Sequence, residues 1–485
     1  MLNELSAILL AFSACFSRDA AFRWFVVIVF GLIVRLDFHG VTSFVRWLAL
    51  EPDYYETLLH FFKASSWRLA ELQRCWANII QKWCSLITLN GHLLMVGDGI
   101  KVSKEAKKMP GVKKLRQDSE NSGKPPFIFG HHFGVVGLLA GTTKSMFCIP
   151  VMAEIHEGVE KLRAFQGKQA PVVNGEKSVT IVTLMLSLAG SLARHLARPC
   201  MLILDAYFAV GPTFVMAREC VDHRGQRLLH VITRAKDNAV GYTGPPPVTG
   251  KRGKGKPPFW GEKVKLWKQF RLRAGDFQAL TLTLYGKEVT LSYLCLDLLW
   301  KPVKERVRFV LVKDESECFI LMCSNLEWLP GEIIHAYSYR FKIEVTFKGL
   351  KHLLGSFCYR FWTKAMPKLS KKTLVDLGGV TDAAKQRLIA ETANAIEGFV
   401  NLGCIALGVL QILALNYPLT IWRKYTGWLR TKRTAVPSEE IVRLVIQENF
   451  YHNFNAFRNT AIYQIIGAKQ RRRLLLIYRG CSGEC

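Results

Sequence analysis

Short apolar segments, with one longer segment among them, fill residues 92–208 and constrain the fold more than any other part of the chain. Four segments have the length and composition of buried strands, and one has the length and period of a helix. The strands are expected at 92–102, 127–141, 145–155 and 199–208, and the helix at 178–197. The order strand, strand, strand, helix, strand predicts an α/β fold built on a central sheet.

Acidic residues close the first and the fourth of these strands. Asp98 is followed by Gly99 in the first strand, and Asp205 lies at the C-terminal end of the fourth. A third acid, Glu344, lies in an amphipathic helix that is expected to begin near Pro330. Two carboxylates at the ends of neighbouring strands, with a third packed over them, can hold two divalent ions about 3.5–4 Å apart. Oxygen ligands of this kind select Mg²⁺ or Mn²⁺ over zinc.

Each acid also has a simpler interpretation. Asp98 and Gly99 form a common turn pair. Asp205 can cap the segment after its strand, and Glu344 can form an ion pair with Arg340 one helical turn away. Taken singly, each acid favours the simpler interpretation. Taken together, the three acids stand on the elements that an RNase H-like nuclease core requires, so the ordered set favours a site for phosphoryl transfer.

The helix that carries Glu344 places several polar residues on one face. At ~100° per residue, positions 337, 340, 344 and 351 fall within about 60° of one another. Tyr337, Arg340 and Lys351 therefore flank the carboxylate, beside an apolar stripe that would pack on the sheet. Cations beside a metal-binding carboxylate suit phosphoryl transfer on a polyanion. Arg340 and Glu344 can pair with each other while no DNA is bound.

The charge of the chain indicates a polyanionic partner. Its 485 residues include 66 Lys and Arg against 38 Asp and Glu, which gives a net charge of +28. Nucleic acid is the first expectation and an anionic membrane the second. The apolar runs 24–34 and 398–415 are expected to be buried helices and not membrane spans, because the first is too short and the second contains Asn401 and Gln411. The 13 cysteines lack a metal-binding spacing and indicate reduced thiols in the cytoplasm.

The residues Tyr337, Arg340, Glu344 and Lys351 match the spacing Y-x2-R-x3-E-x6-K. This spacing resembles the signature of DDE transposases of the insertion-sequence-4 type. The resemblance covers roughly residues 90–360. It implies an RNase H-like core with a mixed sheet and a large β-rich insertion between the second Asp and the Glu. In this chain 139 residues separate Asp205 from Glu344, and their pattern has β character.

By the same resemblance, Asp98, Asp205 and Glu344 would be the catalytic residues and would bind two Mg²⁺ or Mn²⁺ ions. The protein would bind the inverted-repeat ends of a DNA transposon as a homodimer, cleave them, and join the freed 3′-hydroxyls to target DNA. It would act in the cytoplasm of a prokaryote. A non-catalytic regulator that binds transposon ends is the alternative. A basic membrane-associated protein, based on residues 398–415, is a third hypothesis from a different class.

Further cations near the acids are candidate DNA contacts. Arg234 and Lys236 follow a predicted strand soon after the second acid, and Lys101 and Lys104 follow the first. For each pair, a solvated strand end is the alternative. The basic loop 250–256 is a candidate phosphate-binding arm, with a disordered surface loop as the alternative. Some members of the resembled family stack a flipped base on a tryptophan of the insertion, for which Trp260, Trp267 and Trp300 are candidates, with a core position as the alternative.

The sequence divides into five expected regions. Within the insertion two β-hairpins are expected, the first with Gly286 at its turn. The regions are a helical DNA-binding region at 1–90, the first part of the RNase H-like core at 91–239, the β-rich insertion at 240–328, the second part of the core with the Glu helix at 329–383, and a helical region for DNA contact or dimerisation at 384–485. For residues 1–90, a packed helical cap that binds no ligand is the alternative.

Overall fold

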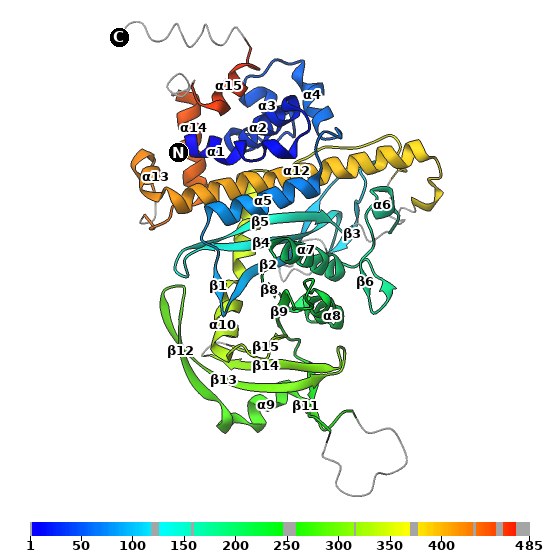
Figure 1. The fold of residues 1–485 in the computed structure, drawn as a ribbon, viewed down its shortest axis with the longest axis vertical. Coiled ribbons are helices and arrows are strands. Elements are labelled where there is room, and N and C mark those ends of the chain that lie inside the picture. Colours follow the sequence, from blue (N-terminus) through cyan, green and yellow to red (C-terminus); the bar gives the residue numbers. More distant parts are fainter. Residues whose placement is uncertain are drawn as a thin grey trace, which may run out of the picture.

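A computed structural model describes residues 2–117, 126–156, 160–245, 259–314, 317–368, 377–429, 433–452 and 459–471. The basic loop predicted at 250–256 lies outside these residues. Figure 1 shows three levels along the long axis: a group of N-terminal and C-terminal helices, a central sheet, and a curved group of strands at the far end. The strands that carry Asp98 and Asp205 belong to the central level.

The central sheet contains both parallel and antiparallel strands. β2 (His92–Ser103), β4 (Phe127–Gly141) and β5 (Met146–Ile155) pair antiparallel, whereas β8 (Cys200–Leu204) and β9 (Leu229–Arg234) run parallel to β2. The strand order is β9-β8-β2-β4-β5. This arrangement confirms the predicted α/β class with an RNase H-like mixed sheet. Two short strands, β1 (Thr88–Leu89) and β3 (Lys113–Arg116), extend it.

The sheet continues beyond β9 into the predicted insertion. Its strands there are β10 (Val240–Tyr242), β11 (Lys263–Lys265), β12 (Gln278–Leu284), β13 (Lys287–Trp300), β14 (Glu305–Lys313) and β15 (Cys318–Cys323). β15 pairs antiparallel with β9, and β14 and β13 follow in order. The pairs β12–β13 and β14–β15 are the two predicted hairpins, and Tyr285 and Gly286 form the turn of the first. The insertion and the core therefore share one sheet.

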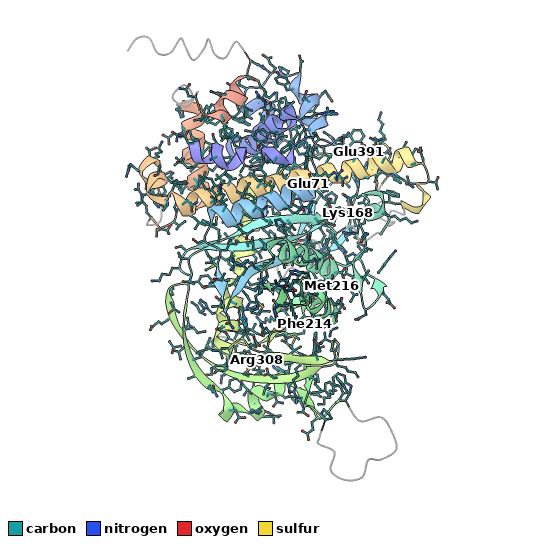
Figure 2. The ribbon with its side chains drawn as sticks, in the orientation of Figure 1. Glu71, Lys168, Phe214, Met216, Arg308 and Glu391 are labelled. Atoms are coloured by element: carbon teal, nitrogen blue, oxygen red, sulfur yellow. The ribbon has the colours of Figure 1, made fainter. Side chains whose placement is uncertain are left out.

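A bidentate ion pair fixes the register between β13 and β14. Arg308 stands opposite Asp297 in the strand register, and its Nε and Nη2 donate to the two carboxylate oxygens at 2.8 and 2.7 Å. Its Nη1 donates to the carbonyl of Trp328 at 2.7 Å. Figure 2 labels Arg308 within this strand group. Paired hydrogen bonds of this kind are geometrically specific as well as strong.

A second apolar core lies between the insertion strands and α8 (Gly211–Glu219). The ring of Phe214, labelled in Figure 2, lies 5.1 Å from the ring of Trp300, and both side chains are buried. Trp300 therefore has the core position that was the alternative to base stacking. Trp267 of α9 (Leu266–Leu272) is exposed.

α7 (Ile181–Leu196) covers one face of the central sheet. A capping box fixes its first turn: Thr180 Oγ1 accepts from the Thr183 N–H, and Thr183 Oγ1 accepts from the Thr180 N–H. Gly97 of β2 leaves room for this helix, because a Cβ there would lie only 2.7 Å from Met185 Sδ. Side chains alternate along a strand, so Asp98 points to the opposite face.

α12 (Ala383–Asn416) is the long central helix in Figure 1. It is long and apolar enough to cross a membrane, but 94% of its most apolar 18-residue window is buried inside the protein. The other apolar run lies in α2 (Asp19–Val34) and is also buried. Both runs are therefore buried helices, as predicted.

Polar side chains of α12 bond the backbone of β5. Asn401 Oδ1 accepts from the Ala153 N–H at 3.1 Å, and its Nδ2 donates to the Ala153 carbonyl at 2.7 Å. Glu397 Oε1 accepts from the Ile155 N–H at 3.1 Å. Among the described residues β5 pairs with β4 alone, so these side chains stand where a further strand would.

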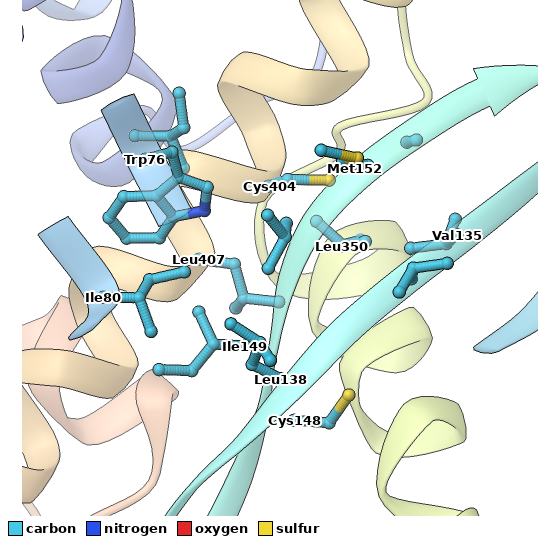
Figure 3. Packing of buried hydrophobic residues seen from close by; sticks show 14 of the residues in the cluster. Trp76, Ile80, Val135, Leu138, Cys148, Ile149, Met152, Leu350, Cys404 and Leu407 are labelled. Atoms are coloured by element: carbon cyan, nitrogen blue, oxygen red, sulfur yellow. The ribbon is translucent and has the colours of Figure 1, made fainter. Parts of the chain in front are cut away.

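The N-terminal and C-terminal helices pack as one group on α12. α2 contacts α12, α14 and α15. Figure 3 shows Trp76 of α5 together with Cys404 and Leu407 of α12 and Met152 of β5. The five-region division remains a prediction. The remaining bounds are α1 (Leu2–Leu10), α3 (Thr42–Trp47), α4 (Tyr54–Phe61), α5 (Leu69–Trp83), α6 (Glu160–Phe165), α13 (Pro418–Lys424), α14 (Glu439–His452), α15 (Ala461–Gly467), β6 (Val172–Val173) and β7 (Glu176–Lys177).

Candidate active site

Asp98 and Asp205 lie at the same level of two neighbouring parallel strands. The register pairs Val96 of β2 with Ile203 of β8, an offset of 107 residues that holds at each of their paired positions. The same offset, carried two residues further, leads from Asp98 to Asp205. Neighbouring strands lie about 4.7–4.9 Å apart. The two acids therefore stand side by side where β8 ends.

Asp98 lies inside its strand and not in a turn. β2 continues to Ser103 and pairs Asp98 with Val135 of β4. The expectation that Asp98 and Gly99 close the strand is therefore wrong. β8 ends at this level and β2 does not, because β4 continues to pair with β2 beyond the end of β8. Asp98 Oδ1 accepts a hydrogen bond from the Gly99 N–H at 2.7 Å.

Asp205 both follows β8 and caps the next turn. Its Oδ1 accepts from the Tyr207 N–H at 3.0 Å, at the start of the 3₁₀ turn η2 (Ala206–Phe208). Its backbone carbonyl accepts from Thr233 Oγ1 of β9 at 2.6 Å. The capping role considered as an alternative is thus present, and it fixes the position of the carboxylate.

Glu344 lies on a broken helical segment. α10 (Pro330–Ser338) begins at Pro330, as predicted, but a 3₁₀ turn η4 (Tyr339–Phe341), α11 (Lys342–Lys348) and a π-helical turn η5 (Gly349–Leu353) follow it. The uniform angle per residue expected over 337–351 therefore does not hold, because the three helix types differ in residues per turn. Lys351 lies in η5 and is exposed.

Two contacts fix this segment in the fold. Thr346 Oγ1 donates to the Cys148 carbonyl of β5 at 2.6 Å. Beyond η5, the buried Arg35 at the end of α2 donates to the carbonyls of Leu354 and Gly355 at 2.6 and 3.0 Å. Arg35 was not among the predicted residues. The only signal for it in the sequence is a cation at the boundary of an apolar run.

Arg340 joins the helical segment to the strand acids. Its Nη2 donates to Glu344 Oε1, and its Nη1 lies 3.5 Å from Asp98 Oδ2. The ion pair between Arg340 and Glu344 is thus present, and the same guanidinium also reaches the strand carboxylate. The Arg340 side chain is 21% exposed and that of Glu344 is 40% exposed. One cation therefore draws Glu344 towards Asp98.

The acids form a poorly solvated site with excess negative charge. Burial, reinforced by the charge of Asp205, raises the pKa of Asp98 to about 7, although Arg340 opposes the rise. Burial also raises the pKa of Asp205, against the positive charge of Arg340. Burial alone would lower the pKa of Arg340, but the charges of Glu344 and Asp98 raise it. Perturbed groups of this kind concentrate at functional sites.

Tyr337 and Arg234 lie beside the acids. Burial raises the pKa of Tyr337 to about 12, and the charges of Arg340, Arg234 and Asp205 also act on its hydroxyl. The phenol therefore stays protonated at neutral pH and can donate a hydrogen bond. Arg234 ends β9, and its Nη2 lies 3.5 Å from Glu317 Oε2.

Two of the other predicted cations, Lys101 and Lys104, donate to backbone carbonyls. Lys101 lies on the opposite face of β2 from Asp98, and its Nζ donates to the Arg116 carbonyl at 2.6 Å. Lys104 Nζ donates to the Phe357 carbonyl and lies 3.7 Å from the centre of the Tyr359 ring. Burial lowers the pKa of Lys104 to about 8. Lys236 is exposed after the end of β9.

Tyr285 reaches the Glu344 segment from the insertion. It stands at the tip of the β12–β13 hairpin with a φ of 52°, followed by Gly286 with a φ of 79°. A two-residue turn with two positive φ angles favours the sequence Asn-Gly. A tyrosine at the first of these positions adopts its positive φ at a steric cost. Its hydroxyl donates to the Ser338 carbonyl, where α10 gives way to η4. Sequence reasoning missed Tyr285; its signal is an aromatic residue where such a turn favours Asn.

The carboxylates have the donor atoms that a hard divalent cation prefers, but they do not converge on one point. Among the described residues, no three His, Cys, Asp or Glu side chains converge closely enough to hold a metal ion. The three acids nonetheless offer only oxygen ligands, and burial together with the charge of Asp205 raises the pKa of Asp98. The guanidinium of Arg340 holds the place between Asp98 and Glu344. The acids therefore fit a hard divalent ion by their donor chemistry, and Arg340 engages two of the three.

Comparison with known proteins agrees with this chemistry. The family described as DDE superfamily endonuclease matches residues 11–285, which is more than half of the chain. The matched part includes Asp98 and Asp205 and ends before Glu344. No curated protein matches the chain.

Proposed function

Since this chain belongs to the DDE superfamily endonucleases, we propose that it is a cut-and-paste transposase of the insertion-sequence-4 type. It binds the inverted-repeat ends of a DNA transposon, cleaves them and joins the 3′-hydroxyls to target DNA. The observation that carries the proposal is that Asp98 and Asp205 lie side by side and that Arg340 pairs with both Asp98 and Glu344. The net charge of +28 supports a DNA partner.

Asp98, Asp205 and Glu344 are the proposed catalytic and metal-binding residues. Endonucleases of this superfamily typically use divalent metal ions, and we propose two Mg²⁺ or Mn²⁺ ions here. Bound to the acids, such ions supply activation of the attacking hydroxyl and charge stabilisation at the phosphodiester. The residues themselves contribute position: the strand pairing fixes two carboxylates, and the contact of Thr346 with β5 fixes the segment that carries the third.

Cations and one phenol around the acids are the proposed DNA contacts. Arg340 and Arg234 can each bind a phosphate through two parallel N–H donors. Tyr337 is protonated at neutral pH and can donate to a phosphate or a sugar oxygen. Lys351 and Lys236 are exposed and would add positive charge along the same DNA strand.

A homodimer is proposed for the complex with DNA, because both transposon ends must be held while they are cut and joined. We also propose that the protein acts in the cytoplasm of a prokaryote. These two statements rest on the likeness of the Tyr337, Arg340, Glu344 and Lys351 spacing to the insertion-sequence-4 signature.

The function is tested with DNA that carries the inverted repeats flanking the gene. The full-length protein is incubated with this DNA and Mg²⁺, and strand cleavage and binding are measured separately. Wild type is expected to cut at the repeat ends. Asp205→Asn and Glu344→Gln are expected to lower cleavage by at least about 10³-fold while DNA binding persists, since each removes one metal ligand.

Asp222→Asn is the matched control, because Asp222 lies in an exposed turn and bonds the N–H groups of Arg224 and Gln226. This variant should cut like wild type. A wild-type protein that binds the ends but never cuts with Mg²⁺ or Mn²⁺ would favour the alternative of a non-catalytic end-binding regulator.

A further inference from the structure

Arg340 holds two of the three acids through a single guanidinium. Its Nη1 lies 3.5 Å from Asp98 Oδ2, and its Nη2 donates to Glu344 Oε1. Within the part of the chain that the structure describes, these are the only ion pairs of Asp98 and Glu344, and Asp205 forms none. When all three acids are ionised, they carry three negative charges against one positive charge. Two negative charges remain uncompensated.

A divalent ion would relieve this excess, but Arg340 engages the same oxygens. An ion shared by the strand acids and Glu344 needs Asp98 and Glu344 oxygens that now accept from the guanidinium. Arg340 and the ion therefore compete for their ligands. Among the described residues the carboxylates do not form a group ready for metal, and Arg340 bridges two of the three.

We propose that Arg340 exchanges between the carboxylates and a DNA phosphate, so that DNA and divalent metal ions bind this protein cooperatively. In the free protein Arg340 occupies the ligand oxygens and keeps metal affinity low. A phosphate that enters the site takes Arg340 as its partner and releases Asp98 and Glu344 for the metal. The inference rests on the proposed function, because it presupposes that the acids bind metal and that DNA is the substrate.

The contacts of Arg340 suit such an exchange. Glu344 is 40% exposed, and ion pairs with exposed partners contribute little net stability. The contact with Asp98 is longer than an ordinary hydrogen bond, at 3.5 Å. A phosphate offers the guanidinium two parallel hydrogen bonds. The exchange therefore replaces two weak ion pairs of Arg340 by two charge-assisted hydrogen bonds to a phosphate. The carboxylates are then free to bind the metal ion.

Thermodynamic linkage makes the prediction reciprocal. If DNA raises the affinity for a divalent ion by some factor, the ion raises the affinity for DNA by the same factor. Couplings of this kind are commonly five- to 150-fold, so a change of about tenfold is expected. Because phosphates and not bases take part, a duplex of arbitrary sequence at low ionic strength is a sufficient probe.

The test measures Mn²⁺ binding by the full-length protein with and without this duplex, from the electron paramagnetic resonance signal of free Mn²⁺. Wild type should bind Mn²⁺ about tenfold more tightly with the duplex. Arg340→Gln should bind Mn²⁺ about tenfold more tightly than wild type without DNA, and saturating DNA should then change little. Arg340→Lys keeps the positive charge and should bind Mn²⁺ weakly without DNA, like wild type.

Arg218→Gln makes the same charge change away from the acids, where Arg218 pairs with Glu305. It should bind Mn²⁺ like wild type, which separates a local exchange from a general effect of net charge. A melting curve for each variant checks that it is folded.

Either of two results would overturn the exchange. The first is that Arg340→Gln binds Mn²⁺ no better than wild type without DNA, which means that Arg340 does not compete with the metal. In that case, loss of Mn²⁺ binding in Asp205→Asn would show that the metal site itself stands and that only the exchange is wrong. If no form binds Mn²⁺ with or without DNA, the exchange and the proposed function both fail.

Discussion

Asp98 and Asp205 are 107 residues apart in the chain, and 107 is also the register offset between the two parallel strands that carry them to the site. The backbone hydrogen bonds of β2 and β8 therefore hold two carboxylates side by side. When both acids are ionised, their mutual repulsion opposes folding.

Removal of one of these charges should stabilise the protein. The pKa of Asp98 rises from 3.8 to about 7 in the fold, so ionised Asp98 opposes folding above pH 4, increasingly up to about pH 7. Asp98→Asn should raise the free energy of unfolding at pH 8 in EDTA, by at most about 4 kcal/mol at 1.36 kcal/mol per pKa unit. The gain should shrink towards pH 4. Urea unfolding at several pH values measures it.

The matched control for this prediction is Asp53→Asn, an exposed acid of the N-terminal helices whose side chain makes no capping hydrogen bond. Its effect should be small and should not grow between pH 4 and pH 8. An Asp98→Asn protein that is less stable than wild type at pH 8 would show that burial of the charge and repulsion by Asp205 do not dominate at Asp98.

The hydroxyl of Tyr285 should matter for cleavage more than for stability. Tyr285→Phe removes the bond to the Ser338 carbonyl at the break before η4, and one such bond contributes about 1 kcal/mol or less. Arg340 lies in η4, so a looser break should lower the rate of DNA cleavage several-fold. Single-turnover cleavage and thermal unfolding of the same preparation measure the two effects.

Tyr293→Phe removes a hydroxyl that bonds Gln278 on the same hairpin, away from that break. It should cleave like wild type. Equal cleavage rates for the two phenylalanine variants would show that the hairpin tip does not position Arg340.

Asn401 should stabilise the fold through the edge of β5. Leucine suits a position in a buried helix, but Asn401→Leu leaves the N–H and carbonyl of Ala153 without the side-chain amide that bonds them. Because buried unsatisfied groups cost about 1–3 kcal/mol each, a loss of at least about 2 kcal/mol is expected in urea unfolding. Asn394→Leu, on the exposed side of the same helix, is the control and should cost much less. Equal losses would argue against the edge contact.

Acid should weaken the contact between α2 and α3 through Asp37. Burial opposes ionisation of Asp37, but hydrogen bonds from Ser43 and Trp47 and the charge of Arg46 hold its pKa at about 2. A lowered pKa stabilises the fold fully above about pH 4, and this contribution is lost as the pH falls towards 2. Asp37→Asn should therefore be less stable than wild type at pH 7 by about 1–2 kcal/mol, and the difference should narrow at acid pH.

Asp19→Asn is the control for the acid effect, since Asp19 forms an exposed pair with Arg23. Its unfolding free energy should track that of wild type across the pH range. A difference between Asp37→Asn and wild type that stays constant from pH 7 to pH 3 would contradict the prediction.

The strands of the core could be predicted because their signals are local. Apolar segments of strand length, Pro330 at a helix start and Gly286 at a hairpin turn need only neighbouring residues. The match of the family to residues 11–285 agrees with the nuclease chemistry that Asp98 and Asp205 indicated.

The features that place the site depend on distant partners and could not be read locally. The register offset joins strands that are far apart in the chain, and no Pro or Gly marks the break at Tyr339–Phe341. The break coincides with the contact from Tyr285, more than 50 residues earlier. Lys104 likewise has a basic side chain near Asp98 in sequence, but it is half-buried and donates to carbonyls of a later segment.

The bonds between α12 and β5 have a consequence for how copies of this chain can meet. A free strand edge is the simplest place for a second molecule to add a strand of its own. Here Asn401 and Glu397 already take the outward backbone groups of Ala153 and Ile155. A second molecule cannot extend the sheet at β5 unless α12 is first lifted away. Any contact between two copies of this chain would therefore have to use the helices or other strand edges.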